Sequence, residues 1–306
     1  MTIEPPAPGE PRRPSGPRNP GDAWVVAPTG ERYWGRFGAA GLLALDAERG
    51  VLLQHRVSWS HFGDTWGLPG GARHEGEAAR DAALREAAEE AGVPDAAVSP
   101  RLLSVLDLGY WSYTTLIGDV TTPFEPTISD PESRALAWVP VADVDARPLH
   151  PGFGSAWDRL RGLLEIRPAV VVDIANVMGS VPDGWWRDRA GAAERLIARI
   201  EALAGAGVSA EALGQPEHTW FPSWHVVIEG AARAASVSAS ASVHVVRAPA
   251  SGDDAIVAES SRLIAAGHAV TVVTSDRELA GRVTDAGASP RGAGWLLELF
   301  SPGGGS

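Results

Sequence analysis

Three glutamates crowd one short segment of this chain, and that crowding restricts what the segment can be. Glu86, Glu89 and Glu90 lie near the end of the stretch GLPGGARHEGEAARDAALREAAEEAGV, which runs from residue 67 to residue 93. The run ARDAALREAAEEAG has no β-branched residue and is rich in Ala, Glu and Arg, which predicts a helix. On a helix, side chains three and four positions apart are neighbours, so like charges at that spacing cost a few tenths of a kcal/mol per pair. Such a face is either a solvated acidic surface or a place that holds a cation.

The composition favours a hard divalent cation. Mg²⁺ and Mn²⁺ prefer oxygen ligands and can bridge to substrate phosphates. The formal net charge of -12 gives no general attraction to a nucleic-acid backbone. All 26 basic residues are arginine, which excludes Schiff-base catalysis by lysine and the lysine of a Walker phosphate loop. The absence of cysteine excludes disulfides, thiolate zinc sites and a cysteine nucleophile.

The segment resembles the Nudix box, G-x5-E-x7-R-E-U-x-E-E-x-G-U, where U is a bulky aliphatic residue. The positions in register are Gly71, Glu77, Arg85, Glu86, Glu89, Glu90, Gly92 and Val93. Ala87 departs from the pattern at the first aliphatic position, which touches none of the carboxylates. The flanking stretches TWGLPGG and WVPVADVDARPLHPGF extend the resemblance over about Asp22 to Trp157.

The resemblance implies metal-dependent hydrolysis of a nucleoside diphosphate linked to another group, with Mg²⁺ or Mn²⁺ as the cofactor. In the family, Glu86 and Glu90 would be the principal metal carboxylates, and the carbonyl matching Gly71 would be a further ligand. Glu89 would be a third ligand or the base that activates water. The catalytic candidates are therefore Glu89 and Glu86, and the choice of general base stays open.

Other residues of this region have supporting roles in the same interpretation. Glu77 and Arg85 would form a structural ion pair on a face away from the metal. Arg56 and Arg73 could contact phosphate oxygens, although an ordinary surface arginine is an equally good interpretation. Four aromatic residues could stack on a base, although aromatics on strands more often pack in a core: Trp59, Tyr110, Trp111 and Tyr113.

The length of the chain and the change in its pattern of apolar and helical segments predict two domains. The first, an α+β Nudix fold with a mixed sheet, is expected because short apolar runs such as GLLALD, GVLLQHR and YWSYTTLIGDV surround the single strong helix. The second is expected to be an α/β, doubly wound, Rossmann-like domain, because apolar runs such as AVVVD and VTVVT alternate with helical patterns. The predicted boundaries are a disordered Pro-rich tail at 1–21, the Nudix domain at 22–157, a helical linker at 158–167, the α/β domain at 168–300 and a flexible tail at 301–306.

Carboxylates of the second domain follow the ends of its predicted strands, where open α/β sheets form their sites. Their order resembles the PIN-like nucleases of the NYN type, in which such residues bind divalent metal. This implies a possible second metal site for RNA cleavage. The alternative is that several of them only cap helices. The matched residues are Asp173, Asn176, Glu229, Asp253, Asp254 and Asp276.

Several alternatives remain open at the level of the sequence. The Nudix-like domain could bind a nucleotide only to regulate a C-terminal ribonuclease, although the intact glutamates argue against this. The isomerase branch of the fold would need a cysteine, which the chain lacks. Oxidised nucleoside triphosphates, ADP-ribose, dinucleoside polyphosphates and nucleotide sugars all suit the same box. We expect a cytoplasmic protein with a nucleotide substrate and no membrane partner, and the oligomeric state stays open.

Overall fold

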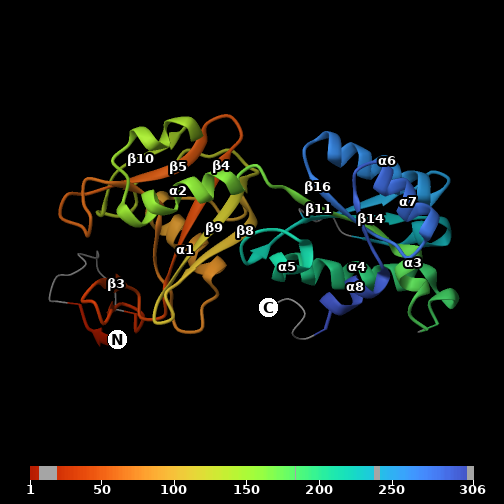
Figure 1. Ribbon diagram of the computed structural model, residues 1–306, viewed down its shortest axis with the longest axis horizontal. Coiled ribbons are helices and arrows are strands. Elements are labelled where there is room, and N and C mark those ends of the chain that lie inside the picture. Colours follow the sequence, from red (N-terminus) through yellow and green to blue (C-terminus); the bar gives the residue numbers. More distant parts are fainter. Residues whose placement is uncertain (7–18, 183, 238–241, 302–306) are drawn as a thin grey trace. The chain divides into compact units, whose positions relative to one another are not determined.

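The computed structural model describes residues 1–6, 19–182, 184–237 and 242–301, and the chain divides into two compact units (Figure 1). The first unit is Met1–Glu165 and the second is Ile166–Ser306. None of the helices in the described residues has the length and apolar character needed to cross a membrane. The expected flexible tail at 301–306 lies, apart from Ser301, outside the described residues.

The first unit is built on a mixed sheet with the strand order β10-β5-β4-β9-β8. The β4 and β9 strands are parallel, and the other pairs along this order are antiparallel. The short strands β6 and β7 pair with β5 and β4. Its elements are β1 (Thr2–Glu4), β2 (Trp24–Val26), β3 (Arg32–Trp34), β4 (Ala39–Asp46), β5 (Gly50–Arg56), β6 (Trp66–Gly67), β7 (Gly70–Ala72), α1 (Ala79–Ala91), β8 (Val98–Asp107), β9 (Ser112–Val120), β10 (Ser133–Val139), the 3₁₀ helix η1 (Val141–Ala146) and α2 (Pro151–Leu163).

The predicted helix is α1, and it ends as the sequence indicates. Gly92 has φ 63° and ψ 29°, the left-handed cap that a glycine adopts without strain. The inner face of α1 is made of alanines, which pack on Leu42, Leu52 and Leu116 of the sheet. Ala87, the residue that departs from the box, is completely buried on this face. A small residue there lets the helix approach the sheet closely.

Two of the predicted boundaries differ from the structure. Residues 2–4, placed in a disordered tail, form β1, which pairs antiparallel with β2 so that Ile3 lies opposite Val25. Residues 158–163, placed in a helical linker, are helical but form the C-terminal half of α2. They belong to the first unit because Leu160 and Leu163 are buried beside Trp157. Residues 7–18 of the expected tail lie outside the described residues.

We expect the first unit to work alone. A chain ending at Glu165 should fold and hydrolyse nucleotides with kcat/KM within about threefold of the whole protein, because a compact unit with its own core folds independently. A chain ending at Arg161 should melt at least about 5 °C lower. It lacks the buried Leu163 and Leu164, and the Leu164 carbonyl accepts a hydrogen bond from Arg101 at 2.6 Å. Thermal unfolding and turnover of the two fragments check this, and aggregation of the longer one would contradict it.

The second unit contains a five-stranded parallel sheet with the order β15-β14-β11-β16-β17. In Figure 1, α6 and α7 lie on one side of this sheet, and α4 and α8 lie on the other. The short strands β12 and β13 pair antiparallel and are not part of this parallel sheet. The elements are β11 (Pro168–Asp173), α3 (Ile174–Gly179), η2 (Trp185–Arg187), α4 (Arg189–Ala206), β12 (Val208–Ser209), α5 (Ala210–Leu213), β13 (Thr219–Trp220), β14 (Ser223–Ile228), η3 (Gly230–Ala234), β15 (Val243–Arg247), α6 (Gly252–Ala265), β16 (Ala269–Val273), α7 (Arg277–Asp285), β17 (Ser289–Arg291) and α8 (Ala293–Leu299).

The central strand β11 is buried along its whole length, as expected for a strand covered by helices on both faces. Side chains of a strand alternate between the two faces. Ala169 and Val171 therefore share one face, where they pack with Ile256 and Leu263 of α6. The parallel sheet and its helices lie where the sequence places them, and the relation to PIN-like nucleases stays a prediction.

Candidate active site

The glutamates of α1 fall into two groups, and the packing of the helix decides which is which. Glu86 and Glu90 are four residues apart, so they lie on the same face as the buried alanines. They are 3% and 9% exposed. Glu89 lies on a different face, and its side chain is 55% exposed. Two carboxylates are therefore held inside the protein, while the third reaches solvent beside them.

The two glycines of the turn are required for different reasons. A Cβ at Gly71 would lie 2.6–2.7 Å from the three atoms of the Glu86 carboxyl group. A Cβ at Gly70 would lie 2.5 Å from the backbone oxygen of Ala40 and 2.6 Å from the Cα of Gly41. Gly71 thus makes room for a functional carboxylate, and Gly70 lets two backbone segments meet.

Glu90 is buried without a full counter-charge. Its Oε2 accepts hydrogen bonds from the backbone N–H of Gly70 at 2.9 Å and from Nε2 of Gln54 at 3.3 Å. Burial, and then the charge of Glu86, raise the pKa of Glu90 to about 8. A nearby cation would stabilise the ionised form of such a buried carboxyl group.

Arg85 joins the acidic residues into one cluster. Its Nε and Nη2 donate to the two carboxylate oxygens of Glu77 at 2.8 and 3.0 Å. Its Nη1 donates to Glu86 at 2.8 Å and to Glu89 at 3.3 Å. The ion pair with Glu77 is present, but Arg85 does not lie apart from the glutamates proposed to bind metal. The guanidinium, with five donor N–H groups in one plane, can span both sets of carboxylates.

The donor set fits a hard divalent cation, because it offers buried carboxylate oxygens short of positive charge. Within the described ranges, however, no three His, Asp or Glu side chains come close enough together to hold a metal ion. The contacts explain this, since Arg85 draws Glu86 and Glu89 to one side while Glu90 turns to Gly70. Metal binding by all three glutamates would therefore require the Arg85 contacts to loosen.

The two candidate phosphate-binding arginines have different surroundings. Arg73 donates through Nε and Nη2 to the backbone oxygen of Glu77, at 3.2 and 2.6 Å, so it shapes the loop before α1. Arg56, at the end of β5, lies near enough to lower the pKa of Glu90. It is also 3.7 Å from Glu132. Arg56 is therefore the better placed of the two to meet a phosphate bound at the glutamates.

Of two further residues next to the glutamates, one was not singled out from the sequence and the other was considered for a different role. Gln54 is fully buried on β5, where it also donates to Ser133 at 2.7 Å. Its amide oxygen has no hydrogen-bond partner among the described residues. Tyr113, considered only for base stacking, is half-buried on β9, and desolvation together with the charge of Glu90 raises its pKa. A lone amide on the inward face of an apolar strand, in GVLLQHR, is the signal that could have identified Gln54.

The other aromatic candidates lie on the surface of the first unit or near it. Trp59 is 44% exposed. Trp111 donates from its indole N–H to the Trp34 carbonyl at 3.1 Å, and its ring centroid is 4.7 Å from that of Tyr33. Trp59 is thus partly exposed, and Trp111 has aromatic and polar partners.

The carboxylates of the second unit lie at the carboxyl edge of its sheet, and most also serve as helix caps or ion pairs. Asp173 caps α3 and accepts a hydrogen bond from Thr274 at 3.0 Å. Burial is the main cause of its raised pKa, with contributions from Asp253 and Glu229. The remaining contacts are Asn176 with the Ser275 N–H at 2.9 Å, Glu229 with the Gly252 N–H at 2.8 Å, Asp254 with Arg282 at 2.6 Å, and Asp276 as the cap of α7.

The part of the chain that contains this site is similar to several known proteins. Residues 35–158 match the model of the NUDIX domain. A Mycobacterium tuberculosis protein named "Putative 8-oxo-dGTP diphosphatase 3" is 46% identical over 154 residues, which cover 47% of this chain and 70% of that protein. A Bifidobacterium longum "Nucleoside triphosphate pyrophosphatase/Nudix hydrolase fusion protein" is 38% identical over 159 residues, 48% of this chain and 32% of its own length. The crystal structure of a Nudix hydrolase from M. smegmatis has 44% identity and a TM-score of 0.44, and the match covers 47% of this chain and 95% of that one.

Proposed function

Because the chain belongs to the Nudix hydrolase family, we propose that its first unit hydrolyses nucleoside triphosphates with release of diphosphate, and that 8-oxo-dGTP is one substrate. The observation that carries the proposal is the pair of buried carboxylates, Glu86 and Glu90, set against the glycine turn. The choice of 8-oxo-dGTP follows the name of the M. tuberculosis relative. The reaction converts 8-oxo-dGTP and water into 8-oxo-dGMP and diphosphate.

The residues of the site have distinct tasks in this proposal. Glu86, Glu90 and the Gly71 carbonyl would hold Mg²⁺ or Mn²⁺, with Glu89 as a further ligand or as the base. When bound, the metal neutralises phosphate charge and polarises the phosphorus under attack. As a water oxygen bonds to phosphorus and the bridging P–O bond breaks, the water proton passes to a carboxylate. Glu89 suits the role of base because its side chain is the exposed one of the three.

Arg85 has a positioning role in the same proposal. It binds Glu77, Glu86 and Glu89 at once, so it sets the spacing of the carboxylates and stabilises their charge before the metal arrives. Arg56 would contact the phosphate chain, because it lies beside Glu90 at the end of β5. A bidentate pair of guanidinium and phosphate is the usual geometry for that contact.

A substrate panel with identified products tests the function. We expect Mg²⁺-dependent release of diphosphate from 8-oxo-dGTP at a higher kcat/KM than from dGTP. Glu89→Gln should lower kcat by at least about tenfold with a smaller change in KM, as for loss of a proton acceptor. Glu75→Gln is the matched control, since Glu75 is exposed on the preceding loop and occupies a variable position of the box.

The same panel separates hydrolysis from nucleotide sensing. A unit that only binds nucleotides would retain ligand without releasing diphosphate, and it would be indifferent to Glu89→Gln. Turnover of ADP-ribose or a dinucleoside polyphosphate, with none of 8-oxo-dGTP, would contradict the proposed substrate while keeping the proposed chemistry. No turnover of any phosphoric anhydride would contradict the mechanism assigned to the glutamates.

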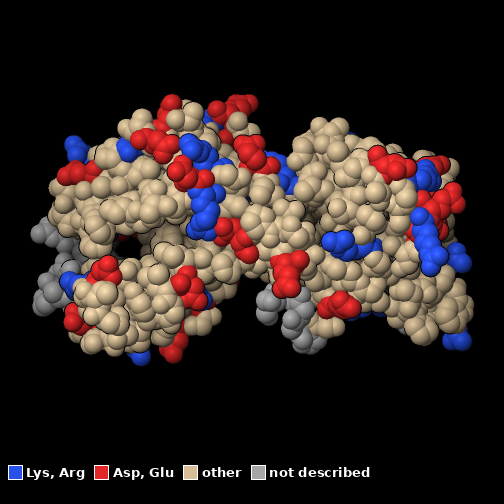
Figure 2. Space-filling view, in the orientation of Figure 1, with Lys and Arg blue, Asp and Glu red and all other residues tan. Residues whose placement is uncertain are grey.

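We further propose a divalent-metal site for RNA cleavage at the carboxyl edge of the second sheet. It is supported by the carboxylates of Asp253 and Glu229, which lie near enough to help raise the pKa of Asp173, although no three carboxylates meet at one metal position in the described residues. On the face drawn in Figure 2, arginines mostly lie beside acidic side chains and form no broad basic surface among the residues described. Because the formal net charge of the chain is -12, an RNA partner would depend on metal more than on bulk charge.

A pair of asparagine substitutions tests this second site. Asp173→Asn should abolish Mn²⁺-dependent cleavage of single-stranded RNA without lowering the melting temperature, because it removes a buried charge that burial disfavours. Asp285→Asn, at an exposed position at the end of α7, is the control. Gel analysis of labelled RNA gives the readout. Absence of cleavage by the wild-type chain would reduce Asp173 and Asp276 to helix caps.

A further inference from the structure

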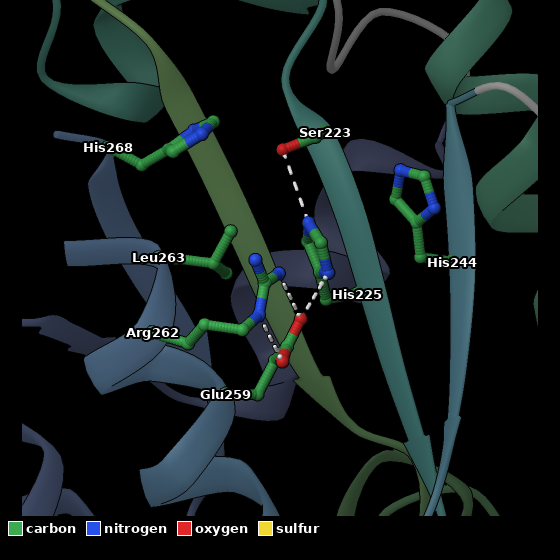
Figure 3. A pocket seen from close by; sticks show the side chains of 7 residues that line it. All are labelled: Ser223, His225, His244, Glu259, Arg262, Leu263 and His268. Atoms are coloured by element: carbon green, nitrogen blue, oxygen red, sulfur yellow. Dashed lines mark hydrogen bonds and ion pairs between the residues drawn. The ribbon is translucent and has the colours of Figure 1, made fainter. Parts of the chain in front are cut away.

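A pocket in the second unit lies apart from both sites described above. It has a volume of about 370 Å³ and opens on the side of the sheet covered by α6 (Figure 3). Ser223 and His225 of β14 line it together with Glu259 and Arg262 of α6. Ser223 is the first residue of β14, whereas Glu229 follows the last one. The pocket is therefore at the opposite end of this strand from the acidic edge.

The strand geometry explains why these residues meet. Ser223 and His225 are two positions apart on β14, so their side chains point to the same face. In the parallel register, His225 lies beside Val171, a residue of the α6 face. Glu259 is on α6, which packs on that face. A serine, a histidine and a glutamate that are separated in the sequence are thus brought into line.

The distances are those of a relay between three groups. Nε2 of His225 is 3.3 Å from Oγ of Ser223, and Nδ1 is 2.7 Å from Oε1 of Glu259. Figure 3 shows the imidazole lying between the hydroxyl and the carboxylate. The carboxylate 2.7 Å from Nδ1 favours a ring proton on that nitrogen, and with the proton there Nε2 faces the serine hydroxyl as an acceptor.

The surroundings of His225 and Glu259 shift the pKa of each of these groups. Burial lowers the pKa of His225 to about 4, while the charge of Glu259 acts in the opposite direction. Arg262 donates to both carboxylate oxygens of Glu259, at 2.9 and 2.7 Å, and this lowers the pKa of that glutamate. At neutral pH the pocket therefore contains a neutral imidazole beside an ionised carboxylate.

We propose that Ser223, His225 and Glu259 form an acyl-hydrolase site that acts on small carboxylic esters. A nucleophile within reach of a base that a third group orients is the arrangement that such chemistry requires. Ser223 Oγ bonds to the ester carbonyl carbon as its proton passes to Nε2 of His225. The C–O bond to the alcohol then breaks, and the imidazolium returns the proton to the departing oxygen. Water releases the acyl group by the same steps, which restores the serine hydroxyl.

The pocket itself limits the substrate. Its volume of about 370 Å³ admits small esters. Arg262 uses Nε and one terminal nitrogen on Glu259, and its other terminal nitrogen points toward the cavity (Figure 3). That cation lines the same pocket as Ser223, and positive charge near the reacting group favours the negative charge that develops during acyl transfer.

The histidines of the pocket do not favour a metal site instead. The rings of His225 and His244 are stacked, with centroids 4.8 Å apart and planes inclined by 28°. Stacked rings direct their nitrogen lone pairs side by side rather than toward one point. Over the described part of the chain, no group of three potential ligands converges on a metal position.

Covalent labelling of the whole protein with a fluorophosphonate tests the proposal. The probe should add once per chain, and peptide mass spectrometry should locate the adduct on Ser223. Ser223→Ala should abolish labelling and the hydrolysis of p-nitrophenyl acetate at this site. Ser261→Ala, an exposed serine of α6, should change neither. Hydrolysis of 8-oxo-dGTP should be unaffected by Ser223→Ala, which keeps this test independent of the first unit.

Variants of the other two residues test the relay. His225→Gln should slow labelling by at least about a hundredfold, and Glu259→Gln by at least about tenfold. As a positioning residue, Glu259 should also affect the pH profile. Its loss should move the acid limb to lower pH, because its charge supports the imidazolium against His244 and Arg262. Circular dichroism confirms that each variant is folded. Absence of labelling, labelling that persists in Ser223→Ala, or rates indifferent to His225→Gln and Glu259→Gln in folded protein would overturn the proposal.

Discussion

Glu90→Gln should reduce kcat/KM for nucleotide hydrolysis by at least about a hundredfold while making the metal-free protein more stable. The change removes one of the two buried carboxylates proposed to hold the metal, and metal-dependent charge stabilisation is worth several kcal/mol. It also removes a buried negative charge beside Glu86. Glutamine keeps the shape of the side chain and an oxygen that can accept the Gly70 N–H.

The gain in stability should depend on pH in a defined direction. The pKa of Glu90 is about 8 in the folded state against an ordinary value of 4.5, so the folded protein binds this proton more tightly than the unfolded chain. Protonation of Glu90 makes its full contribution to the free energy of unfolding of the wild type below pH 4.5. This contribution is lost as the pH rises through 8. Glu90→Gln should therefore match wild type near pH 4 and exceed it above pH 8, by on the order of 2–4 kcal/mol.

Thermal unfolding in EDTA across pH 4 to 9, with turnover measured in Mg²⁺, checks both parts. Glu75→Gln serves again as the control, because that side chain is exposed. A Glu90→Gln variant with more than about a tenth of wild-type turnover would contradict the metal-holding role. A stability difference that does not vary with pH would contradict the raised pKa of Glu90.

Gly71→Ala should lower kcat/KM by about a hundredfold although it changes no charge and removes no functional group. The new methyl would lie 2.6–2.7 Å from the Glu86 carboxyl group, so this carboxylate must move. A displacement of about 1 Å in a catalytic group is enough for a loss of that size. The melting temperature should fall little, because the atoms that give way are the end of a side chain.

Gly70→Ala is the matched comparison for Gly71→Ala. Its methyl would meet the Ala40 oxygen and the Gly41 Cα, which are backbone atoms of β4 and cannot move independently. We expect a loss of about 2–3 kcal/mol in unfolding free energy from this overpacking. Parallel melting curves and Mg²⁺-dependent turnover of the two variants distinguish them. Equal melting temperatures for the two variants would contradict the different reasons for which glycine is required at these positions.

Features set by neighbouring residues were predictable from the sequence. Helix α1 and its left-handed cap at Gly92 follow from an Ala- and Glu-rich run that ends in glycine. The strands β4, β5, β9, β14 and β16 follow from short apolar runs bounded by turn residues. The spacing of Glu86 and Glu90 also follows, since four residues separate side chains on one helical face. In each case the decisive interactions lie within a few positions along the chain.

Features that depend on a distant partner could not be predicted. Thr2–Glu4 forms a strand only because β2 offers a matching edge. Leu160 and Leu163 of the segment 158–163 are buried because the first unit covers one side of α2, whereas the sequence alone also suits a helical linker between domains. Gln54 gains its importance from Glu90, which is 36 residues away. No local pattern contains these contacts.

The sequence by itself thus determined the family resemblance, the acidic residues of the box and the order of helices and strands, because a motif and its periodicity are written along the chain. Only the tertiary structure decided that Glu86 and Glu90 are buried while Glu89 is exposed. It also placed Arg85 in contact with Glu77, Glu86 and Glu89. In the second unit it brought Glu259 next to His225. Burial and the approach of residues from different elements are properties of packing in three dimensions. They decide which of these carboxylates is enclosed by the protein and which one reaches water.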